Sequence, residues 1–301
     1  MTRTVAVIVN PLAGRGKGGK TAPEIGAALH HNGIDAALLL AGSPEEALEM
    51  ARKAVDDGVD AVVAAGGDGT VNLAVQAVAG TDTPLAIIPV GTGNDNANLI
   101  GITDVDTAIQ ALADFHVRPI DVGQVTTSDG SQRWFMGVLS SGFDSCVNER
   151  ANKMRWPKGE LRYLIGILAE LGTFKAIPYE VDIDGEKYRD HGMLVAVGNG
   201  VSYGGGMKVC AGAKPDDGLF MITWLKKASK FDFLRVFPSV YKGTHVEHHT
   251  VEQYTGQVVR IAAPDQIVYA DGERIGPLPA DISLFRDKLK VVLPANSTIG
   301  A

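Results

Sequence analysis

The chain has 301 residues, of which 45% are hydrophobic and 21% are charged, the balance of a globular protein with room for two domains of ordinary size. Its 28 basic and 35 acidic residues give a formal net charge of −7, which argues against a sequence-independent grip on nucleic acid. The apolar run near the N-terminus is too short for a signal peptide and no run approaches the length of a transmembrane segment, so we expect a cytoplasmic protein.

The first part of the chain alternates short β-branched segments with amphipathic ones. Strands are predicted at residues 4–9, 36–40, 61–65 and 85–88. A helix is predicted to follow Ser43, an N-cap with Pro44 at the first helical position, and to end at Gly58. Buried strands that alternate with helices predict a parallel sheet covered on both faces, and such sheets bind ligands beyond the carboxyl ends of their strands.

The loop after the first predicted strand satisfies the Walker A pattern literally, with GxxxxGKT at 14–21. A P-loop NTPase is therefore one alternative. The context argues against it, because the strand ends at Val9, well before the first glycine, and a Walker B strand ending in Asp is missing. The backbone of this loop, with Arg15 or Lys17, is still a candidate to contact a nucleotide.

The predicted strand at 61–65 runs directly into the pentapeptide GGDGT at 66–70, which opens a helix pattern. Glycines let the backbone approach a ligand closely, and a helix N-terminus adds positive potential, so the loop is a candidate phosphate site. Asp68 would repel phosphate unless a cation intervenes, which indicates Mg²⁺ held together with a nucleotide. The alternative is a tight turn in which Asp68 is an ordinary N-cap.

A second glycine turn follows the predicted strand at 85–88. Gly91 and Gly93 flank Thr92, and Asn94 with Asp95 can cap the next helix. Two such loops at adjacent strand ends predict a nucleotide cleft. Taken alone, the second loop could be a helix cap and nothing more.

After residue 123 the pattern changes to shorter alternating segments, with hairpin turns at 128–130, 184–185 and 271–272. This predicts a β-rich second part, interrupted by helical stretches at 146–174 and 231–242. We expect an α/β nucleotide-binding domain at 1–125 and a β-rich domain at 126–301, whose last strand is a candidate to return to the first domain.

Together the motifs NPxxG at 10–14, GGDGT at 66–70 and PxGTGND at 89–95 resemble the diacylglycerol kinase-like catalytic family, which includes sphingosine kinases, ceramide kinases and bacterial lipid kinases. The resemblance continues with SGFD at 141–144, YGGGM at 203–207, DDG at 216–218 and DGE at 271–273, and it covers nearly the whole chain. GGDGT alone would also fit NAD kinases and phosphofructokinases, but the ordered set of later motifs is typical of the lipid kinases.

The resemblance implies an NAD kinase-like α/β domain followed by a β-sandwich, and transfer of the γ-phosphate of ATP to a lipid hydroxyl such as that of diacylglycerol. It implies that Glu273 is the general base, that Asp68 supports the catalytic Mg²⁺ and that Asp95 orients the acceptor hydroxyl. A structural Mg²⁺ would be bound by the carbonyls of Lys214 and Leu219 and the carboxylate of Asp217. The nucleotide contacts would be Asn10, Pro11, Gly14, Gly66, Gly67, Asp68, Gly69, Thr70, Asn72, Gly91, Thr92, Gly93 and Asn94.

Several positions depart from the family pattern. Leu73 stands where Glu is usual, Asn96 and Asn98 stand where Phe and Arg are usual, and Gly137 stands where Asn is usual. These departures keep open a nucleotide-binding regulatory module without turnover, and an NAD kinase-like enzyme is a further alternative. The sequence does not choose among lipid acceptors or nucleoside triphosphates, and a homodimer is one candidate for the oligomeric state.

A segment at 150–162 contains five basic residues and one acid, Glu160, and is a candidate patch for anionic lipid headgroups, so we expect the protein to meet its lipid at the membrane surface. A solvated helix surface is the alternative. His245, His248 and His249 form a cluster that no Cys or carboxylate pattern completes, and we expect a surface loop there rather than a metal site.

Overall fold

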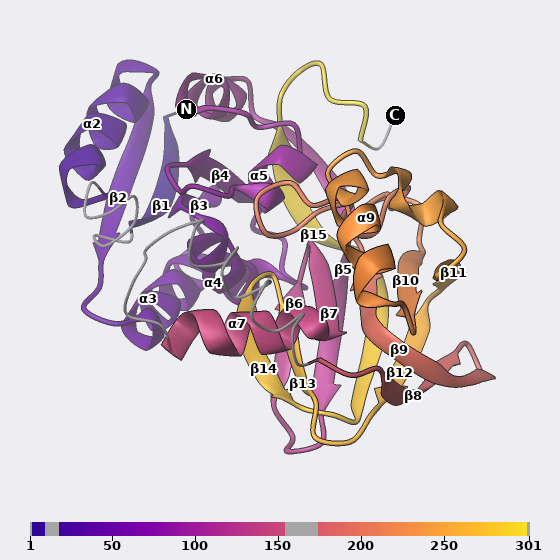
Figure 1. Ribbon diagram of the computed structural model, residues 1–301. Helices are drawn as coiled ribbons and strands as arrows, with labels where there is room; N and C mark the ends of the chain where they lie inside the picture. Colours follow the sequence, from indigo (N-terminus) through magenta and orange to yellow (C-terminus); the bar gives the residue numbers. More distant parts are fainter. Residues whose placement is uncertain (1, 10–17, 154–173, 300–301) are drawn as a thin grey trace.

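The computed structural model describes residues 2–9, 18–153 and 174–299. Its first part is an α/β layer and its second part is a pair of packed β-sheets, as the sequence predicts (Figure 1). The first part contains β1 (Arg3–Val9), α2 (Gly18–His31), β2 (Ile34–Leu40), α3 (Pro44–Asp56), β3 (Ala61–Gly66), α4 (Asp68–Val78), β4 (Leu85–Pro89), α5 (Asp95–Leu99) and α6 (Val105–Asp114).

The second part adds longer strands and a few helices. It contains β5 (His116–Thr127), β6 (Gln132–Phe135), β7 (Val138–Gly142), α7 (Phe143–Lys153), β8 (Ile177–Ile183), β9 (Glu186–Gly198), β10 (Phe220–Lys226), α9 (Lys230–Val240), the 3₁₀ helix η1 (Thr244–Glu247), β11 (Val251–Gly256), β12 (Val258–Ala262), β13 (Ile267–Ala270), β14 (Glu273–Pro277) and β15 (Ala280–Leu293).

Strands β2, β1, β3 and β4 form a parallel sheet in that order, against which α2, α3, α4 and α6 pack. β3 reads AVVAAG and is buried along its whole length, as expected of a strand covered on both faces. The helix expected after Ser43 is confirmed, since the Ser43 hydroxyl accepts the N–H of Glu46 at 3.2 Å. The carboxyl ends of β1, β3 and β4 therefore meet at one edge, from which α4 departs.

The second part is a β-sandwich whose two sheets share β9. The first half of β9 pairs with β8, and its second half pairs with β7 and β10. β9 changes its pairing partners at Gly192. A Cβ there would lie 2.2 Å from Nε1 of Trp224, so the close packing at this position requires glycine. Between the sheets, Phe135 and Phe220 stack with ring centroids 5.8 Å apart in a core that also buries Trp224.

The three predicted hairpin turns are confirmed, since they connect β5 to β6, β8 to β9 and β13 to β14. Asp184 and Gly185 have φ values of 50° and 93°, and Asp271 and Gly272 have values of 49° and 83°. Two successive left-handed residues are the signature of a tight type I′ hairpin. Each of these two turns therefore places the next residue at the start of a strand.

β15 joins the two parts of the chain. It runs antiparallel to β5 and β12, and Val291 also pairs in parallel with Leu85 of β4. The last residues of β15 are buried in the core of the α/β part. A division of the chain after residue 125, which falls within β5, stays a prediction. In the described ranges, no helix has the length and apolar character needed to cross a membrane.

Candidate active site

The first glycine loop joins β3 directly to α4. β3 ends at Gly66, Gly67 is the N-cap, and the helix begins at Asp68. A Cβ at Gly66 would lie 2.2 Å from the hydroxyl oxygen of Thr70, so only glycine allows the helix to fold back so closely on the strand. The first turn of α4 thus stands at the carboxyl edge of the sheet, where helical N–H groups can bind an anion.

The second glycine loop lies against the first. A Cβ at Gly91 would lie 2.5 Å from Cα of Gly67, and the N–H of Val90 donates to the carbonyl of Gly66 at 3.1 Å. Asn94 precedes α5 but makes no side-chain cap to it. Its side chain instead closes its own loop, accepting the N–H of Gly91 and donating to the carbonyl of the same residue, both at 3.1 Å. The structure therefore brings the two predicted loops into backbone contact.

Asp68 lies between the two loops. Its Oδ1 accepts the N–H of Asn96 at 3.1 Å, and its Oδ2 lies 2.9 Å from where a Cβ at Gly93 would stand. Burial raises the pKa of Asp68 by more than the hydrogen bond from Asn96 lowers it, and nearby Asp95 adds to the increase. A cation beside Asp68 would favour its ionised form and relieve this cost.

Asp95 begins α5 and links this helix to the second part of the chain. The carboxylate is only 7% exposed. It accepts the hydroxyl of Ser202 at 3.0 Å and the N–H groups of Gly205 and Gly206 at 2.7 and 2.8 Å. Both carboxylate oxygens thus accept hydrogen bonds from the turn that contains the YGGGM motif. Asp95 therefore positions this turn relative to α5.

Glu273, the proposed base, begins β14 and reaches across to the glycine loop. Its Oε1 lies 2.9 Å from where a Cβ at Gly69 would stand. Glu273 is exposed, while the preceding Asp271 is buried. The structure therefore brings the DGE turn, more than 200 residues away in the sequence, to the N-terminus of α4.

A cleft of about 360 Å³ opens between these elements. Its walls come from the end of β1, the start of α3, the first turns of α4 and the start of β14. Lining residues include Val9, Ser43, Glu45, Gly69, Thr70, Asn72, Arg133, Glu273 and Arg274. Arg133 and Arg274 bring two guanidinium groups that sequence reasoning missed, because an isolated Arg in a strand carries no motif. The size and polarity suit a small charged ligand.

Asp271 is a second residue whose placement the motif alone did not reveal. Its carboxylate accepts the N–H groups of Met136, Gly137 and Val138 at 3.0 to 3.1 Å. Burial raises its pKa to about 7, although the N–H donors oppose the increase, and the charge of Asp68 adds to it. Asp271 thus anchors the DGE turn to the start of β7.

Two departures from the family pattern meet in space beside Asp271. A Cβ at Gly137 would lie 2.6 Å from Oδ1 of Asp271 and 2.7 Å from Oδ1 of Asn96. The amide of buried Asn96 thus occupies the space beside position 137, where the family usually carries Asn. A side chain at position 137 would therefore meet both Asn96 and Asp271.

The predicted structural metal site lies on a loop held by buried Asp121. The Asp121 carboxylate accepts the N–H of Gly218 at 2.7 Å and that of Asp287 at 3.0 Å. Asp217 is exposed, and its Oδ1 accepts the N–H of Leu219 at 3.0 Å. In the described part of the chain, no three His, Cys, Asp or Glu side chains gather as a metal site. Any Mg²⁺ here would need backbone carbonyls or nucleotide oxygens as further ligands.

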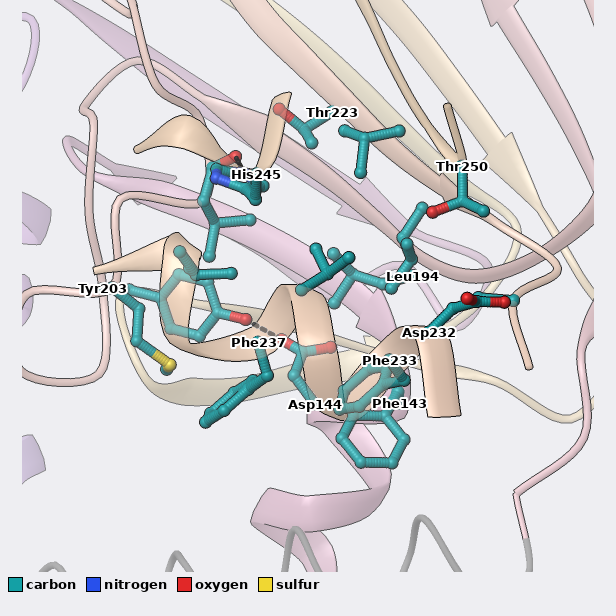
Figure 2. A pocket seen from close by; sticks show the side chains of 17 residues that line it. Phe143, Asp144, Leu194, Tyr203, Thr223, Asp232, Phe233, Phe237, His245 and Thr250 are labelled. Atoms are coloured by element: carbon teal, nitrogen blue, oxygen red, sulfur yellow. Dashed lines mark hydrogen bonds between the residues drawn. The ribbon is translucent and has the colours of Figure 1, made fainter. Parts of the chain in front are cut away.

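A second cavity lies beneath α9 (Figure 2). Apolar side chains line most of it: Phe143, Leu194, Met207, Val209, Leu225, Phe233, Val236, Phe237 and Val240. Its polar groups are few. The Tyr203 hydroxyl donates to Asp144 at 3.0 Å, as the dashed line in Figure 2 marks, and Oδ1 of Asp144 and Nδ1 of His245 are buried without a hydrogen-bond partner among the described residues.

The expected surface position of the histidine cluster is wrong for His245, which is 4% exposed and lines this cavity. Its Nε2 lies 3.1 Å from the carbonyl of Val209, and burial lowers the pKa of the imidazole. His248 is half-buried and His249 is exposed, as expected. The error arose because the η1 turn folds the first histidine inward, which no local pattern indicates.

Some predicted residues lie outside the described ranges. They are Asn10, Pro11 and Gly14 of the first loop, its basic residues Arg15 and Lys17, and most of the basic segment at 150–162. Val9, the last residue of β1, lines the cleft.

Comparison with protein families gives two matches that together cover most of the chain. Residues 4–125 match the model described as "Diacylglycerol kinase catalytic domain", and residues 137–293 match "YegS C-terminal NAD kinase beta sandwich-like domain". A protein of Mycobacterium tuberculosis described as diacylglycerol kinase is 41% identical over 293 residues, covering 96% of this chain and 95% of that protein. One of Bacillus subtilis with the same description is 28% identical over 295 residues, covering 96% and 95%.

Solved structures support the same fold. A crystal structure of a diacylglycerol kinase from Bacillus anthracis superposes with a TM-score of 0.74 at 22% identity, covering 99% of this chain and 98% of that one. An NAD kinase from Archaeoglobus fulgidus in complex with ATP has a TM-score of 0.55 at 16% identity, covering 98% and 94%. The predicted α/β domain followed by a β-sandwich is confirmed.

Proposed function

The chain belongs to the diacylglycerol kinase family, a family of kinases that transfer phosphate to a hydroxyl, and we propose that it transfers the γ-phosphate of ATP to the hydroxyl of a diacylglycerol-like lipid. The observation that carries this proposal is the approach of Glu273 to the glycine loop, where its Oε1 lies 2.9 Å from the place that a Cβ at Gly69 would take. A carboxylate that could act as a base thus stands beside a helix N-terminus that suits a polyphosphate.

The nucleotide side of the proposal rests on the two glycine loops. The phosphates of ATP would lie against Gly66, Gly67, Gly69, Thr70 and Asn72, with Gly91, Thr92, Gly93 and Asn94 on the neighbouring loop and Asn10, Pro11 and Gly14 on the first. The N–H groups and positive end of α4 would offset the phosphate charge. Arg133 lines the same cleft and adds positive charge from the sandwich side, and Arg274, also in the lining, is paired with Glu149 at 2.9 Å.

Two sites fit Mg²⁺ by the chemistry of their donors. Asp68 offers a partly buried carboxylate at the tip of the glycine loop, and its raised pKa marks a negative charge that a cation would stabilise. Asp217, with the carbonyls of Lys214 and Leu219, offers the hard oxygen ligands of a structural site. When bound beside Asp68, Mg²⁺ would neutralise charge on the transferring phosphate.

The proposed transfer needs one proton movement by the protein. The acceptor oxygen bonds to the γ-phosphorus, its proton passes to a carboxylate oxygen of Glu273, and the bond from the γ-phosphorus to the bridging oxygen breaks to release ADP. We propose that Asp95 serves this step indirectly, because it fixes the turn at 203–207, whose Tyr203 and Met207 line the cavity beneath α9. We propose that this turn sets the position of the acceptor hydroxyl.

The cavity beneath α9 is the proposed place for an acyl chain of the acceptor. Its apolar lining would bury hydrocarbon, and burial contributes about 0.8 kcal/mol for each CH₂ group. Oδ1 of Asp144 and Nδ1 of His245 are acceptors without a donor among the described residues, so a lipid hydroxyl, which can donate, would suit them, since unsatisfied buried polar atoms cost about 1–3 kcal/mol each.

The test is a screen of lipid acceptors in mixed micelles with radiolabelled ATP. Glu273→Gln should lower turnover by about 10²–10⁴-fold with ATP binding retained, since it removes the base but no proposed nucleotide contact. Glu186→Gln is the matched control, because Asp184-Gly185-Glu186 forms the same turn far from the cleft. Unchanged turnover in Glu273→Gln would refute the role of the base.

The same screen separates the alternatives. ATP binding without any phospholipid product would favour a regulatory module without turnover. Phosphorylation of a soluble dinucleotide, with lipid irrelevant, would favour an NAD kinase-like enzyme. A product formed from one lipid class would identify the acceptor.

A further inference from the structure

Helix α9 is apolar on both of its faces. Phe233, Phe237 and Val240 point inward and line the cavity described above (Figure 2). On the opposite side of the same 11-residue helix, Phe231 is 74% exposed and Leu234 is 50% exposed. A helix with one face in solvent normally carries polar residues there, so the outward apolar residues call for a partner.

Tyr241, just after the helix, continues this outward stripe at 48% exposure. Six large apolar side chains stand exposed in the described residues, at Leu40, Leu219, Phe231, Leu234, Tyr241 and Val258. Half of them therefore gather on this one helix and its C-cap. Scattered exposed residues need no explanation, but a cluster does.

Exposed cations lie on α9 and in the segments next to it, at Lys227, Arg235 and Lys242, and exposed Lys208 lies beside the helix C-terminus, where its N–H donates to the carbonyl of Val240. The acids nearby are Asp232, which Ser229 binds at the helix start, and exposed Glu247. Lys226 does not contribute, because it is paired with Asp190 and Glu252. A locally positive surface on a chain of net charge −7 selects for an anionic partner.

We propose that the outer face of α9, defined by Phe231, Leu234, Arg235, Tyr241 and Lys242, docks on the surface of an anionic lipid bilayer, an inference that rests on the lipid-kinase function proposed above. Phe231, Leu234 and Tyr241 enter the boundary between headgroups and acyl chains, and the cations meet the headgroups.

The position of the cavity favours a bilayer over a protein partner. The inner face of α9 forms the wall of the apolar cavity, so a lipid that leaves a bilayer beneath α9 passes from one apolar environment to another around a single helix. The Tyr203 hydroxyl and Asp144 lie at the other end, toward the turn that Asp95 holds.

The experiment is vesicle flotation of the full chain without nucleotide, with vesicles of phosphatidylcholine alone or mixed equally with phosphatidylglycerol. The double variant Phe231→Ser with Leu234→Ser should bind mixed vesicles about tenfold more weakly or worse, since two inserted side chains are lost. Arg235→Gln and Lys242→Gln should each weaken binding to mixed vesicles about fivefold and leave binding to phosphatidylcholine unchanged. Val258→Ser, 54% exposed on β12, and exposed Lys187→Gln are the controls and should bind as the wild type does.

Turnover of a water-soluble short-chain diacylglycerol separates docking from catalysis. The apolar double variant should keep wild-type turnover of that substrate and lose turnover of long-chain diacylglycerol in mixed vesicles. Wild-type vesicle binding by the double variant, or equal losses in the controls, would overturn the docking surface. If no lipid is phosphorylated by the wild type, the proposed function fails, while the flotation result still decides whether this face binds a bilayer.

Discussion

Asp271 is a carboxyl group with three N–H donors and almost no access to water. Because burial raises its pKa from 3.8 to about 7, the folded protein holds this proton to a higher pH than the unfolded chain does. The folded state therefore binds more protons between these values. From this group alone, the free energy of unfolding falls as pH rises from 3.8 to about 7 and is then constant.

We expect Asp271→Asn to remove that part of the pH dependence, because the amide keeps an oxygen for Gly137 and Val138 but cannot ionise. Urea unfolding across the same pH window measures it. Asp265→Asn is the control, since Asp265 is an exposed Asp with φ of 54° and Asn tolerates the same backbone. An undiminished slope in Asp271→Asn would show that other carboxyl groups carry the effect.

The two DGE turns show what residue-level reading can and cannot predict. At 184–186 and 271–273 the same tripeptide makes the same left-handed turn, and both turns were predicted from sequence. Only Glu273 meets the glycine loop, through a contact with Gly69. Local chemistry gives the turn, whereas the role of the glutamate depends on pairing across some 200 residues, which one sequence indicates only through family resemblance.

At the scale of elements, Gln76 clamps α4 to β6. Its side-chain N–H₂ donates to the carbonyl of Trp134 at 2.8 Å, and its Oε1 accepts the N–H of Trp134 at 2.9 Å. α4 is the helix that begins at the glycine loop, and β6 carries Arg133 at the edge of the cleft. This amide pair therefore fixes the two walls of the cleft relative to one another.

Gln76→Leu should lower the free energy of unfolding by about 1–3 kcal/mol, because it leaves the N–H and carbonyl of Trp134 without partners. Gln110→Leu, an exposed change on α6, should shift it by less than about 0.5 kcal/mol. Denaturant midpoints of the two variants provide the comparison. Equally small changes in the free energy of unfolding of the two variants would mean that water or another side chain replaces the hydrogen bonds of Gln76 to Trp134.

Element types were predictable because their signals are local. The β-branched runs predicted the four parallel strands, and the Asp-Gly dipeptides predicted the hairpins. The strand that crosses between sheets at Gly192 and the Gln76 clamp were not predictable, since both depend on contacts with residues distant in sequence, Trp224 and Trp134. The prediction of a surface position for His245 was wrong for the same reason.

At the scale of the molecule, β15 makes one cooperative unit of the two parts. Val291 is fully buried and pairs with Arg118 on one side and with Leu85 on the other. We expect a single unfolding transition, with coincident curves from far-ultraviolet circular dichroism, dominated by the helices, and from tryptophan fluorescence, to which Trp224 contributes from the core of the sandwich.

Val291→Ala should shift both curves together, by about 2 kcal/mol, because it opens a cavity in a core to which both parts contribute. Val258→Ala, at an exposed position, should leave both within about 0.5 kcal/mol of the wild type. Two separated transitions, or a shift in one probe alone, would show that the parts unfold independently.

The hydrogen bonds of the Asp95 carboxylate offer a way to couple the binding of the two proposed substrates. This carboxylate belongs to the helix that follows a glycine loop, yet it grips the backbone of Gly205 and Gly206, next to the acceptor cavity. If the protein binds ATP and a lipid as proposed, a lipid that stabilises these hydrogen bonds would raise the affinity for ATP. Thermodynamic reciprocity would then require ATP to raise the affinity for the lipid by the same factor, so that the two substrates would bind cooperatively.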